Sequence, residues 1–335
     1  MKWLLTPIAW LFAAISYVRW ALYRWGLFLH SKSAPAPVIS VGNIAVGGTG
    51  KTPCVIWLAR GLKEKGFDPV ILSRGYGRQT KNRFFLMGDI PQAKLAGDEP
   101  ALIARRLPVI PIVVHKDRIG SAKEVGGGEK RVFILDDGFQ HLKLKRDFDV
   151  VLLPADDPFS GGYFLPLGRL RDGLWRLADA DAIVLVGERD RIPDRLLPYR
   201  DKIYHAEKLP ISLRTLNNAE VPMDSLRGER VVAFSAIGDP ASFHRTIAAI
   251  GAQIVAAKNY RDHHSFIAKD IRDIETLAAE HDADILITTD KDAVRLAALR
   301  PRLATYVMGI EFLPCESEIL IDNIINSLPK KAKRL

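Results

Sequence analysis

A glycine-rich stretch that ends in a lysine and a threonine can contact the phosphate groups of a nucleotide. Residues 47–52 read Gly-Gly-Thr-Gly-Lys-Thr and follow the apolar run 38–41. A glycine-rich turn between a strand and a helix brings backbone N–H groups close to phosphate oxygens, while the lysine adds positive charge and the threonine hydroxyl can bind Mg²⁺. The sequence therefore predicts a nucleoside triphosphate site whose contacts are Gly47, Gly48, Thr49, Gly50, Lys51 and Thr52.

This stretch departs from the pattern G-x-x-x-x-G-K-[ST] at one position. Ala45 stands where the first glycine of the pattern belongs. A plain glycine turn before a helix is the structural alternative. Three glycines with Lys-Thr after a strand of buried type rarely arise for packing alone, so we interpret residues 47–52 as a phosphate loop.

Two adjacent carboxylates, Asp136 and Asp137, follow the apolar run 132–135. In enzymes with a phosphate loop, a carboxylate at the end of such a strand holds Mg²⁺ directly or through water. The alternative for this segment alone is an Asp-Asp-Gly turn. Together with Thr52, the two aspartates form the predicted magnesium site.

Other predicted strands also end in polar residues. Arg74 and Tyr76 follow the run 69–73, and Arg118 follows the run 110–114. Arginine suits bidentate recognition of phosphate, so these side chains are candidates for phosphate or substrate contacts. Solvated loop residues are an equally good interpretation of the same pattern.

Asp98 and His263 are candidates for proton transfer. Asp98 lies in Gly-Asp-Glu-Pro at the start of a helical segment, where acidic residues and proline are favoured, so helix capping explains it without any chemistry. His263 follows Asp262. A histidine beside a carboxylate can tune a proton-transfer step, although a solvated loop is the commoner explanation.

Strand-like and helix-like segments alternate through the first two thirds of the chain. The predicted strands are 38–42, 69–73, 110–114, 131–136, 148–153 and 182–186, and the predicted helices between them are 51–66, 98–107, 117–125 and 172–179. This alternation predicts an α/β fold with a mostly parallel sheet of P-loop type flanked by helices. Ligand sites are expected beyond the carboxyl ends of the strands, where the motifs fall.

A second, smaller α/β domain is expected after a connector. Residues from about 208 to 230 contain proline, asparagine and glycine and lack strong periodicity, and strand-like runs then return at 231–235, 253–257, 284–288 and 304–308. The predicted organisation is a membrane-associated helix in 1–32, a kinase-type core in 33–210, a linker in 211–230 and the smaller domain in 231–335. The basic tail 330–334 is expected to be a solvated terminus.

The amino-terminal segment has the composition of a membrane-associated helix. No acidic residue precedes Glu64, residues 3–18 are uncharged, and four of the six tryptophans lie in the first 25 residues. Arg19, Arg24 and Lys32 follow the apolar run, which favours insertion into one leaflet with cations at anionic lipid headgroups. A cleaved signal peptide, a core helix and a single membrane span are the alternatives.

The overall composition limits the class of protein. The chain has 335 residues, 48% hydrophobic content and a formal net charge of +9, which excludes disorder and favours anionic partners. Two cysteines are too few for a disulfide framework and fit a reducing, cytosolic compartment. A basic motif interleaved with aromatic residues is not apparent, so nucleic acid is not an expected partner.

The motifs together resemble the tetraacyldisaccharide 4'-kinase family, the lipid A kinases of Gram-negative bacteria. The matching segments are 41–53, 72–76, 96–100, 134–141, 165–171, 233–240 and 262–263, and the resemblance extends from the amino-terminal apolar segment to Asp292. The set is ordered along nearly the whole chain, and several of its members are unusual.

The resemblance implies transfer of the γ-phosphate of ATP, with Mg²⁺, to the 4'-hydroxyl of a tetraacylated glucosamine disaccharide 1-phosphate at the cytoplasmic face of the bacterial inner membrane. It implies two domains that close on the nucleotide, Asp98 as the base, His263 as its partner from the other domain, and Lys51 at the phosphates. Weaker candidates for substrate or phosphate contacts are Arg74, Tyr76, Arg118, His141 and Arg171. The expected partners are this lipid substrate and anionic inner-membrane lipids, and the expected state is a monomer.

Two positions depart from the family pattern. Asp172 and Gly173 stand where glutamate and proline are frequent, and Asp290 stands where glutamate is expected. The rival interpretation is a membrane-associated GTPase or metallochaperone-type nucleotide switch that uses the same loop. Guanine-specific proteins usually carry Asn-Lys-x-Asp, whereas Lys291 and Asp292 are adjacent here and follow no asparagine.

Overall fold

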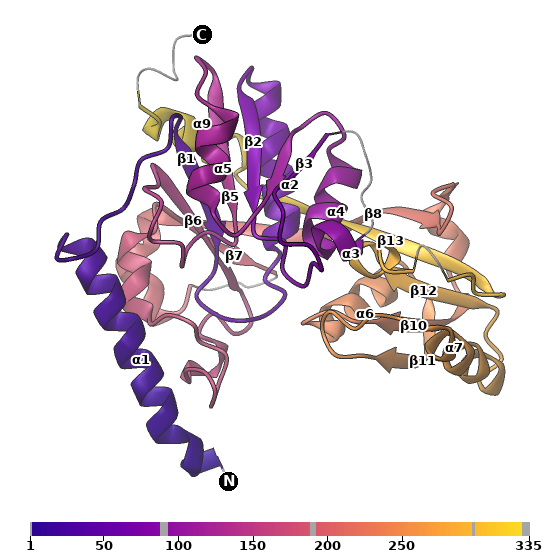
Figure 1. Ribbon diagram of the computed structural model, residues 1–335. Helices are drawn as coiled ribbons and strands as arrows, with labels where there is room; N and C mark the ends of the chain where they lie inside the picture. Colours follow the sequence, from indigo (N-terminus) through magenta and orange to yellow (C-terminus); the bar gives the residue numbers. More distant parts are fainter. Residues whose placement is uncertain (1, 88–92, 188–191, 297–298, 330–335) are drawn as a thin grey trace.

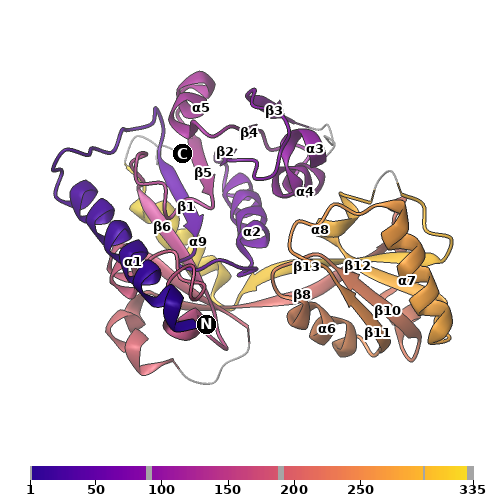
Figure 2. The same ribbon diagram turned by 60° about the horizontal axis from the view of Figure 1, so that its bottom comes forward.

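The computed structural model describes residues 2–87, 93–187, 192–296 and 299–329, and these form two lobes that share one sheet (Figures 1 and 2). The strands are β1 (Val38–Gly42), β2 (Asp68–Ser73), β3 (Phe84–Leu86), β4 (Ile112–Val114), β5 (Arg131–Asp136), β6 (Phe148–Pro154), β7 (Ala182–Val186), β8 (Ile203–Thr215), β9 (Glu220–Val221), β10 (Arg230–Ser235), β11 (Gln253–Asn259), β12 (Ile285–Thr289) and β13 (Ala304–Pro314). Their order is β11-β10-β12-β13-β8-β7-β6-β1-β5-β2-β4-β3, and β9 pairs with β8.

Helices cover both faces of this sheet. The α-helices are α1 (Lys2–Arg24), α2 (Lys51–Glu64), α3 (Ala93–Ala96), α4 (Asp98–Arg106), α5 (Arg118–Val125), α6 (Pro240–Ala249), α7 (Ala268–Glu280), α8 (Asp290–Ala293) and α9 (Ser317–Ser327). Short 3-10 helices are η1 (Ser160–Gly162), η2 (Leu174–Asp179), η3 (Asp194–Lys202) and η4 (Met223–Leu226). The α/β class with a mostly parallel sheet, predicted from the alternating segments, is confirmed.

Side chains alternate between the two faces of each strand, so successive residues pack against different helices. In the first lobe, Ile39 and Val41 of β1 join the core under α2, α4 and α9, whereas Val38 joins the core on the α5 side. In the second lobe, Phe234 of β10 packs toward α7, and its neighbour Ala233 packs toward α6. Because successive strand residues point to opposite faces, both faces of the central strands are apolar and both are covered.

The prediction of an irregular connector at 211–230 is wrong for its first residues. β8 continues to Thr215 and pairs antiparallel with β13 over nearly its whole length, and β9 and η4 follow within the expected linker. β13 then pairs with β12 of the second lobe, so β8 and β13 carry the sheet from one lobe into the other (Figure 2). Many β8 side chains are half-buried, which is why the segment lacks the continuous apolar run of a central strand.

The chain returns to the first lobe at its carboxyl end. Leu320, Ile321 and Ile324 of α9 pack in the core cluster that contains the buried face of α2. The segment 231–335, expected to form the smaller domain, therefore contributes its last helix, α9, to the first lobe. The basic tail 330–334 lies outside the described residues.

Most predicted elements appear close to their expected bounds. The helix expected at 172–179 is the 3-10 helix η2, and β4 is shorter than the expected strand at 110–114. The short strands β3 and β9 were not expected. β3 pairs antiparallel with β4 at the edge of the sheet, where three residues are too few for a periodic signal.

Helix α1 stands at the side of the first lobe and carries the amino terminus away from it (Figure 1). Its docked face is made of small residues, which are Ala9, Ala13, Ser16 and Ala21. Its exposed face carries large apolar side chains, which are Ile8, Trp10, Leu11, Ile15 and Val18. Residues 5–24 are long and apolar enough to cross a membrane by length and composition, and only 22% of the most apolar window is buried, unlike a core helix. Exposed apolar surface of this kind marks an interaction site.

Two cations of α1 contact protein groups. Arg24 pairs with Asp179 at 2.5 Å, and Arg19 donates to the carbonyl of Gln140 at 3.2 Å. Trp20 donates its ring N–H to the same Asp179 at 2.6 Å. Arg24 and Trp20 thus anchor the helix to η2, and Arg19 anchors it to the turn after β5, while the role of the arginines at lipid headgroups stays a prediction.

We expect Gly42→Ala to destabilise the protein by ~1–3 kcal/mol because a methyl group there has no space. A Cβ at Gly42 would lie 2.6 Å from Cβ and 2.8 Å from the backbone nitrogen of Phe139, at the point where β1 meets the Asp-Asp turn. Urea unfolding measures the effect. Gly128→Ala is the matched control, since its Cβ would lie 3.4 Å from Arg131. Equal stability of the two variants would contradict the expectation.

Candidate active site

The phosphate loop leaves the end of β1 and begins α2. Gly47 and Gly50 have φ angles of 138° and 87°, which favour glycine, and Gly50 is the residue that precedes the first turn of α2. The side-chain amide of Asn43 donates to the hydroxyl of Thr49 at 2.9 Å and so braces the loop from inside. The loop thus presents the amino terminus of a 14-residue helix, as anion binding requires.

Asp137 is held by two cations. Arg171 donates to both of its carboxylate oxygens at 2.9 and 2.8 Å, and Lys51 Nζ lies 3.6 Å from Oδ1. Burial alone would raise the pKa of Asp137, but the hydrogen bonds from Arg171 and the charges of Lys51 and Arg118 lower it well below its usual range. This carboxylate is ionised, and its charge is already balanced.

Asp136 has the opposite environment. It is buried, and its Oδ2 accepts a hydrogen bond from the Ser73 hydroxyl at 2.9 Å. Burial, together with the negative charges of Glu99 and Asp137, raises the pKa of Asp136 to about 7. An adjacent cation would relieve this excess of negative charge, so the surroundings of Asp136 fit a bound divalent metal.

The donor set available to a metal consists of hard oxygen atoms. These are the Thr52 hydroxyl and the carboxylates of Asp136 and Asp137, and Mg²⁺ prefers such ligands. Within the described ranges, no group of three or more His, Cys, Asp or Glu side chains is arranged to hold a metal ion. Mg²⁺ usually binds through one or two carboxylates while phosphates and water complete its shell.

The remaining predicted contacts have different surroundings. Arg118 is buried and donates to the backbone carbonyls of Asp136 at 3.0 Å and Asp137 at 3.4 Å, so it braces the turn itself. Burial and the charges of Arg118 and Arg146 lower the pKa of His141 to about 4, so its ring is neutral at pH 7. Arg74 and Tyr76 are exposed on the loop after β2.

Asp98 and His263 come together from opposite lobes. His263 Nδ1 lies 2.9 Å from Asp98 Oδ2 across 165 residues of sequence, and Arg295 Nη2 lies 2.7 Å from the same oxygen. Burial alone would raise the pKa of Asp98, but the hydrogen bonds from His263 and Arg295 lower it below its ordinary value. His263 adopts a φ of 63°, and the centroid of its ring lies 5.3 Å from the centroid of the Tyr76 ring.

Sequence reasoning missed Arg295 as part of this group. Arg295 also pairs with Asp292 at 3.2 Å, and Lys291 pairs with Asp262 at 3.0 Å and approaches Glu99 at 3.9 Å. The run Asp-Lys-Asp at 290–292 was the available signal, because several charges in one short segment indicate either a salt-bridge network or a site.

Asp172 is an internal link between α1 and the phosphate loop. Its carboxylate is buried and accepts from Ser16 of α1 at 2.5 Å and from Gln140 at 3.0 Å. Gln140 in turn donates to the carbonyl of Asn43 at 2.7 Å, and Asn43 braces Thr49. The departure from glutamate at 172 thus falls inside the protein, where a shorter carboxylate fits between Ser16 and Gln140.

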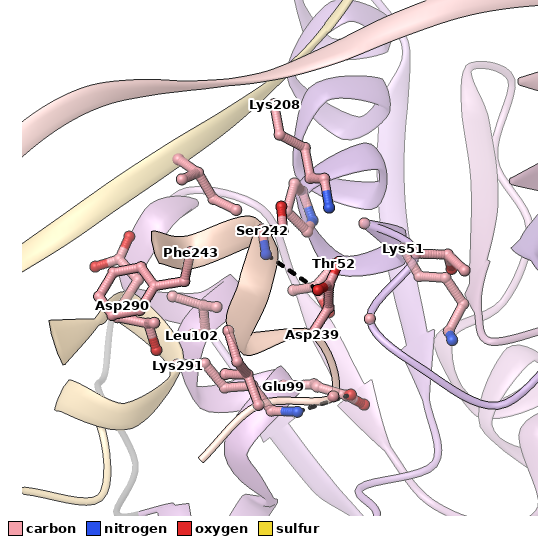
Figure 3. Close-up of a pocket in the computed structure, with 18 of the residues that line it drawn as sticks. Lys51, Thr52, Glu99, Leu102, Lys208, Asp239, Ser242, Phe243, Asp290 and Lys291 are labelled. Atoms are coloured by element: carbon pink, nitrogen blue, oxygen red, sulfur yellow. Dashed lines mark hydrogen bonds and ion pairs between the residues drawn. The ribbon is translucent and has the colours of Figure 1, made fainter. Parts of the chain in front are cut away.

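A pocket lies between the lobes, with the phosphate loop on one side and residues of α6 and α8 on the other (Figure 3). Its polar wall includes Thr52, Glu99, Asp239 and Lys291, and its apolar wall includes Ile56, Leu102, Phe243, Met308 and Ile310. A polar end for phosphates and an apolar end for a flat ring suit a nucleotide. None of the apolar residues belongs to a motif, so no sequence pattern pointed to them.

Comparison with known proteins matches this chain to a described family. A family model described as tetraacyldisaccharide-1-P 4'-kinase matches residues 1–328. A tetraacyldisaccharide 4'-kinase of Pelobacter propionicus is 35% identical over 341 residues, covering 98% of this chain and 92% of the relative. One of Dechloromonas aromatica is 37% identical over 334 residues, covering 97% and 92%.

A solved structure agrees with the sequence relatives. The crystal structure of LpxK from Aquifex aeolicus in complex with ATP is 31% identical, has a TM-score of 0.76, and matches 98% of this chain and 99% of that chain. Agreement over both whole chains covers the phosphate loop and both lobes. This chain therefore belongs to the tetraacyldisaccharide 4'-kinase family.

Proposed function

We propose that the protein transfers the γ-phosphoryl group of ATP to the 4'-hydroxyl of a tetraacylated glucosamine disaccharide 1-phosphate, a step in lipid A biosynthesis. The observation that carries the proposal is the contact of Asp98 with His263, 2.9 Å apart and drawn from opposite lobes, with Glu99, the residue next to Asp98, in the wall of the pocket that the phosphate loop lines. A nucleotide switch requires no such base, and the family assignment favours the kinase.

On the nucleotide side, the loop residues 47–50 offer backbone N–H groups to the phosphates and Lys51 offers its charge. Lys51 Nζ lies 3.6 Å from Asp137, near enough to share its charge between that carboxylate and a phosphate oxygen. Arg171 holds Asp137 from the other side. In phosphoryl transfer the protein contributes mainly positioning and charge stabilisation, which is what this arrangement supplies.

On the acceptor side, Asp98 takes the proton of the sugar hydroxyl. The oxygen of that hydroxyl attacks the γ-phosphorus, the bond from that phosphorus to the bridging oxygen breaks, and ADP leaves. A lowered pKa keeps Asp98 ionised at pH 7, so it is ready to accept a hydrogen bond from the hydroxyl. His263 and Arg295 orient its carboxylate, and because they come from the second lobe, they act only when the lobes are together.

Thr52 and Asp136 would hold Mg²⁺, with Asp137 beside them. When bound, the metal neutralises charge on the phosphate oxygens during transfer. Asp136 has a buried carboxylate with excess negative charge, whereas Asp137 is already paired with Arg171, so we assign the direct contact to Asp136.

The two lobes, as we propose, open and close about β8 and β13. These two strands carry the sheet from one lobe to the other, and the contacts of Asp98 with His263 and Arg295 cross between the lobes. Closure excludes water and completes the site, which is a common device in kinases.

We place the protein at the cytoplasmic face of the inner membrane, with α1 inserted among anionic lipids and the protein acting as a monomer. The exposed apolar face of α1 supports membrane association, and a lipid acceptor requires it. Replacement of two outward residues, Leu11→Gln with Ile15→Gln, should weaken binding to phosphatidylglycerol-containing vesicles by about tenfold or more. Vesicle sedimentation measures this.

The matched control for the vesicle experiment is Val109→Gln with Ile319→Gln. These residues are also exposed and apolar but lie away from α1, in the turn before β4 and on α9. The control should bind vesicles like the wild type. Equal loss in both double variants, or no loss in either, would refute the assignment of α1 as the membrane contact.

The activity itself is tested with detergent-solubilised protein, Mg-ATP and the disaccharide 1-phosphate lipid. We expect a product heavier by one phosphoryl group, detected by mass spectrometry, and no product from an acceptor that lacks the 4'-hydroxyl. ATP hydrolysis without a phosphorylated lipid would refute the proposal. A strong preference for GTP over ATP would instead favour the interpretation as a nucleotide switch.

A further inference from the structure

Lys208 is a cation of the nucleotide pocket that no motif contains. It lies on β8, one of the two strands that join the lobes, and it lines the pocket together with the phosphate loop, Asp239 and Ser242. Figure 3 shows its side chain reaching from β8 toward the space between Thr52 and Ser242, whereas Lys51 points away on the other side of the loop. Two lysines therefore approach this pocket from different directions.

The Lys208 side chain lies directly over the phosphate loop. A Cβ built on Gly50 would lie 3.6 Å from its Cδ, which is ordinary van der Waals contact. Gly50 has its φ of 87° at the start of α2, where backbone N–H groups are available to an anion. The ammonium group of Lys208 is thus carried to the end of the helix at which phosphates bind.

Among the described residues, Lys208 differs from the other lysines of the pocket in having no hydrogen-bond or ion-pair partner. Lys291 pairs with Asp262 at 3.0 Å, and Lys51 lies 3.6 Å from Asp137. Over residues 2–87, 93–187, 192–296 and 299–329, Lys208 Nζ makes no hydrogen bond or ion pair. Lys208 is half-buried, and withdrawing a cation from water without a partner is unfavourable, so this position favours a bound anion.

The electrostatic surroundings agree with an anion nearby. Burial lowers the pKa of Lys208, and the charge of Arg245 lowers it further, while Asp239 and Asp156 oppose the change. Asp239 caps α6, since its Oδ1 accepts from the Ser242 backbone at 3.1 Å, and among the described residues it forms no ion pair with Lys208. A bound phosphate would oppose this lowering of the Lys208 pKa.

We propose that Lys208 binds the phosphate chain of the nucleotide from the side opposite Lys51. The inference rests on the proposed kinase function and extends it, because the nucleotide then contacts the strand that joins the lobes. Binding of the triphosphate would hold β8 against the phosphate loop and so favour the arrangement in which His263 and Arg295 reach Asp98.

The test compares nucleotide binding by the wild type and Lys208→Gln, with calorimetry on the full-length protein and no lipid acceptor. A hydrogen bond to a charged group corresponds to about tenfold to a hundredfold in Kd, so ATP and ADP should bind that much more weakly. Adenosine, which lacks phosphates, should bind as to the wild type. Lys208→Arg, which retains the charge, should recover most of the affinity for ATP.

Arg245→Gln is the matched control. It removes the same charge from an exposed side chain of the neighbouring cavity that does not line the nucleotide pocket. It should change the Kd for ATP by less than about twofold. If Arg245→Gln weakens ATP as much as Lys208→Gln does, the effect is one of net charge and the proposal is wrong.

Two further outcomes overturn the proposal. Equal weakening of adenosine and ATP would mean that Lys208 supports the shape of the pocket, and unchanged ATP binding would mean that it contacts no phosphate. If Lys208→Gln does not fold, Lys208→Met provides the same comparison, since loss of an unpaired, half-buried cation should not lower the Tm. Failure of lipid phosphorylation with normal ATP binding would instead count against the kinase function alone.

Discussion

Asp98→Asn is expected to lower kcat for lipid phosphorylation by about 10²–10⁴-fold, the usual contribution of a general base. The amide has nearly the shape of the carboxylate but cannot take the hydroxyl proton. Asp98 contacts the second lobe through His263 and Arg295 at 2.9 and 2.7 Å, and among the described residues it makes no hydrogen bond or ion pair with the phosphate loop. The Kd for ATP should therefore stay within about threefold of the wild type.

Adjacent histidines provide a control for this assignment. His263→Gln should lower kcat, because it removes the group that orients Asp98, whereas His264→Gln should not, because His264 pairs with Asp270 at 2.9 Å. Steady-state kinetics with the lipid acceptor measures both. An Asp98→Asn enzyme with full kcat, or equal losses in the two histidine variants, would exclude the proposed base.

Asp136→Asn is expected to abolish most activity and yet stabilise the metal-free and nucleotide-free protein at pH 8. The activity loss, about 10²-fold or more, follows from removal of the metal carboxylate. The stability gain follows from the pKa of Asp136, raised by burial to about 7 from an ordinary 3.8. Ionisation of this group costs stability as pH rises from about 4 through 7, so the gain should be absent near pH 4 and reach at most ~4 kcal/mol at pH 8.

The neighbouring Asp137→Asn should change stability in the opposite direction. Although burial alone would raise it, the pKa of Asp137 is lowered by Arg171, Lys51 and Arg118, so its ionised form stabilises the fold above pH 4 and that contribution is lost on acidification. Urea unfolding of both variants at pH 5 and pH 8 measures the difference. If both substitutions shift stability in the same direction at pH 8, the two environments have been assigned wrongly.

These opposite expectations for adjacent residues have a structural cause. Asp136 ends β5 with its side chain in the interior, where Ser73 is its hydrogen-bond donor. Asp137 has a φ of 47° and turns its carboxylate toward Arg171 and Lys51. The sequence Asp-Asp indicates a metal site, but which of the two carries unbalanced charge depends on groups that come from other strands.

The sequence by itself determined the parts of the site that neighbouring residues build. The phosphate loop needs a strand, a glycine-rich turn and a helix start, and all three lie within residues 38–64. The Asp-Asp turn likewise needs only β5 and its following residues. Alternating apolar runs also sufficed for the α/β class, since burial of both sheet faces requires them.

Resemblance to a family added roles that the residues alone did not supply. Taken alone, Asp98 is explained as a residue that stabilises a helix start, and it does lie in the first turn of α4. Its expected pairing with His263 came from the ordered set of motifs. The contact at 2.9 Å joins residues 165 positions apart, and local periodicity carries no information on such a separation.

Only the tertiary structure decided how the two lobes are joined and which groups balance the charges between them. From the sequence, the later part of β8 is predicted to be a connector, because its half-buried side chains give no continuous apolar run. The segment forms a strand because it pairs with β13, some hundred residues later in the chain. Arg295 beside Asp98, Asp172 between Ser16 and Gln140, and Lys208 over Gly50 all depend on that pairing or on packing between distant segments. Such contacts are decided by long-range burial and charge, which a linear pattern does not record.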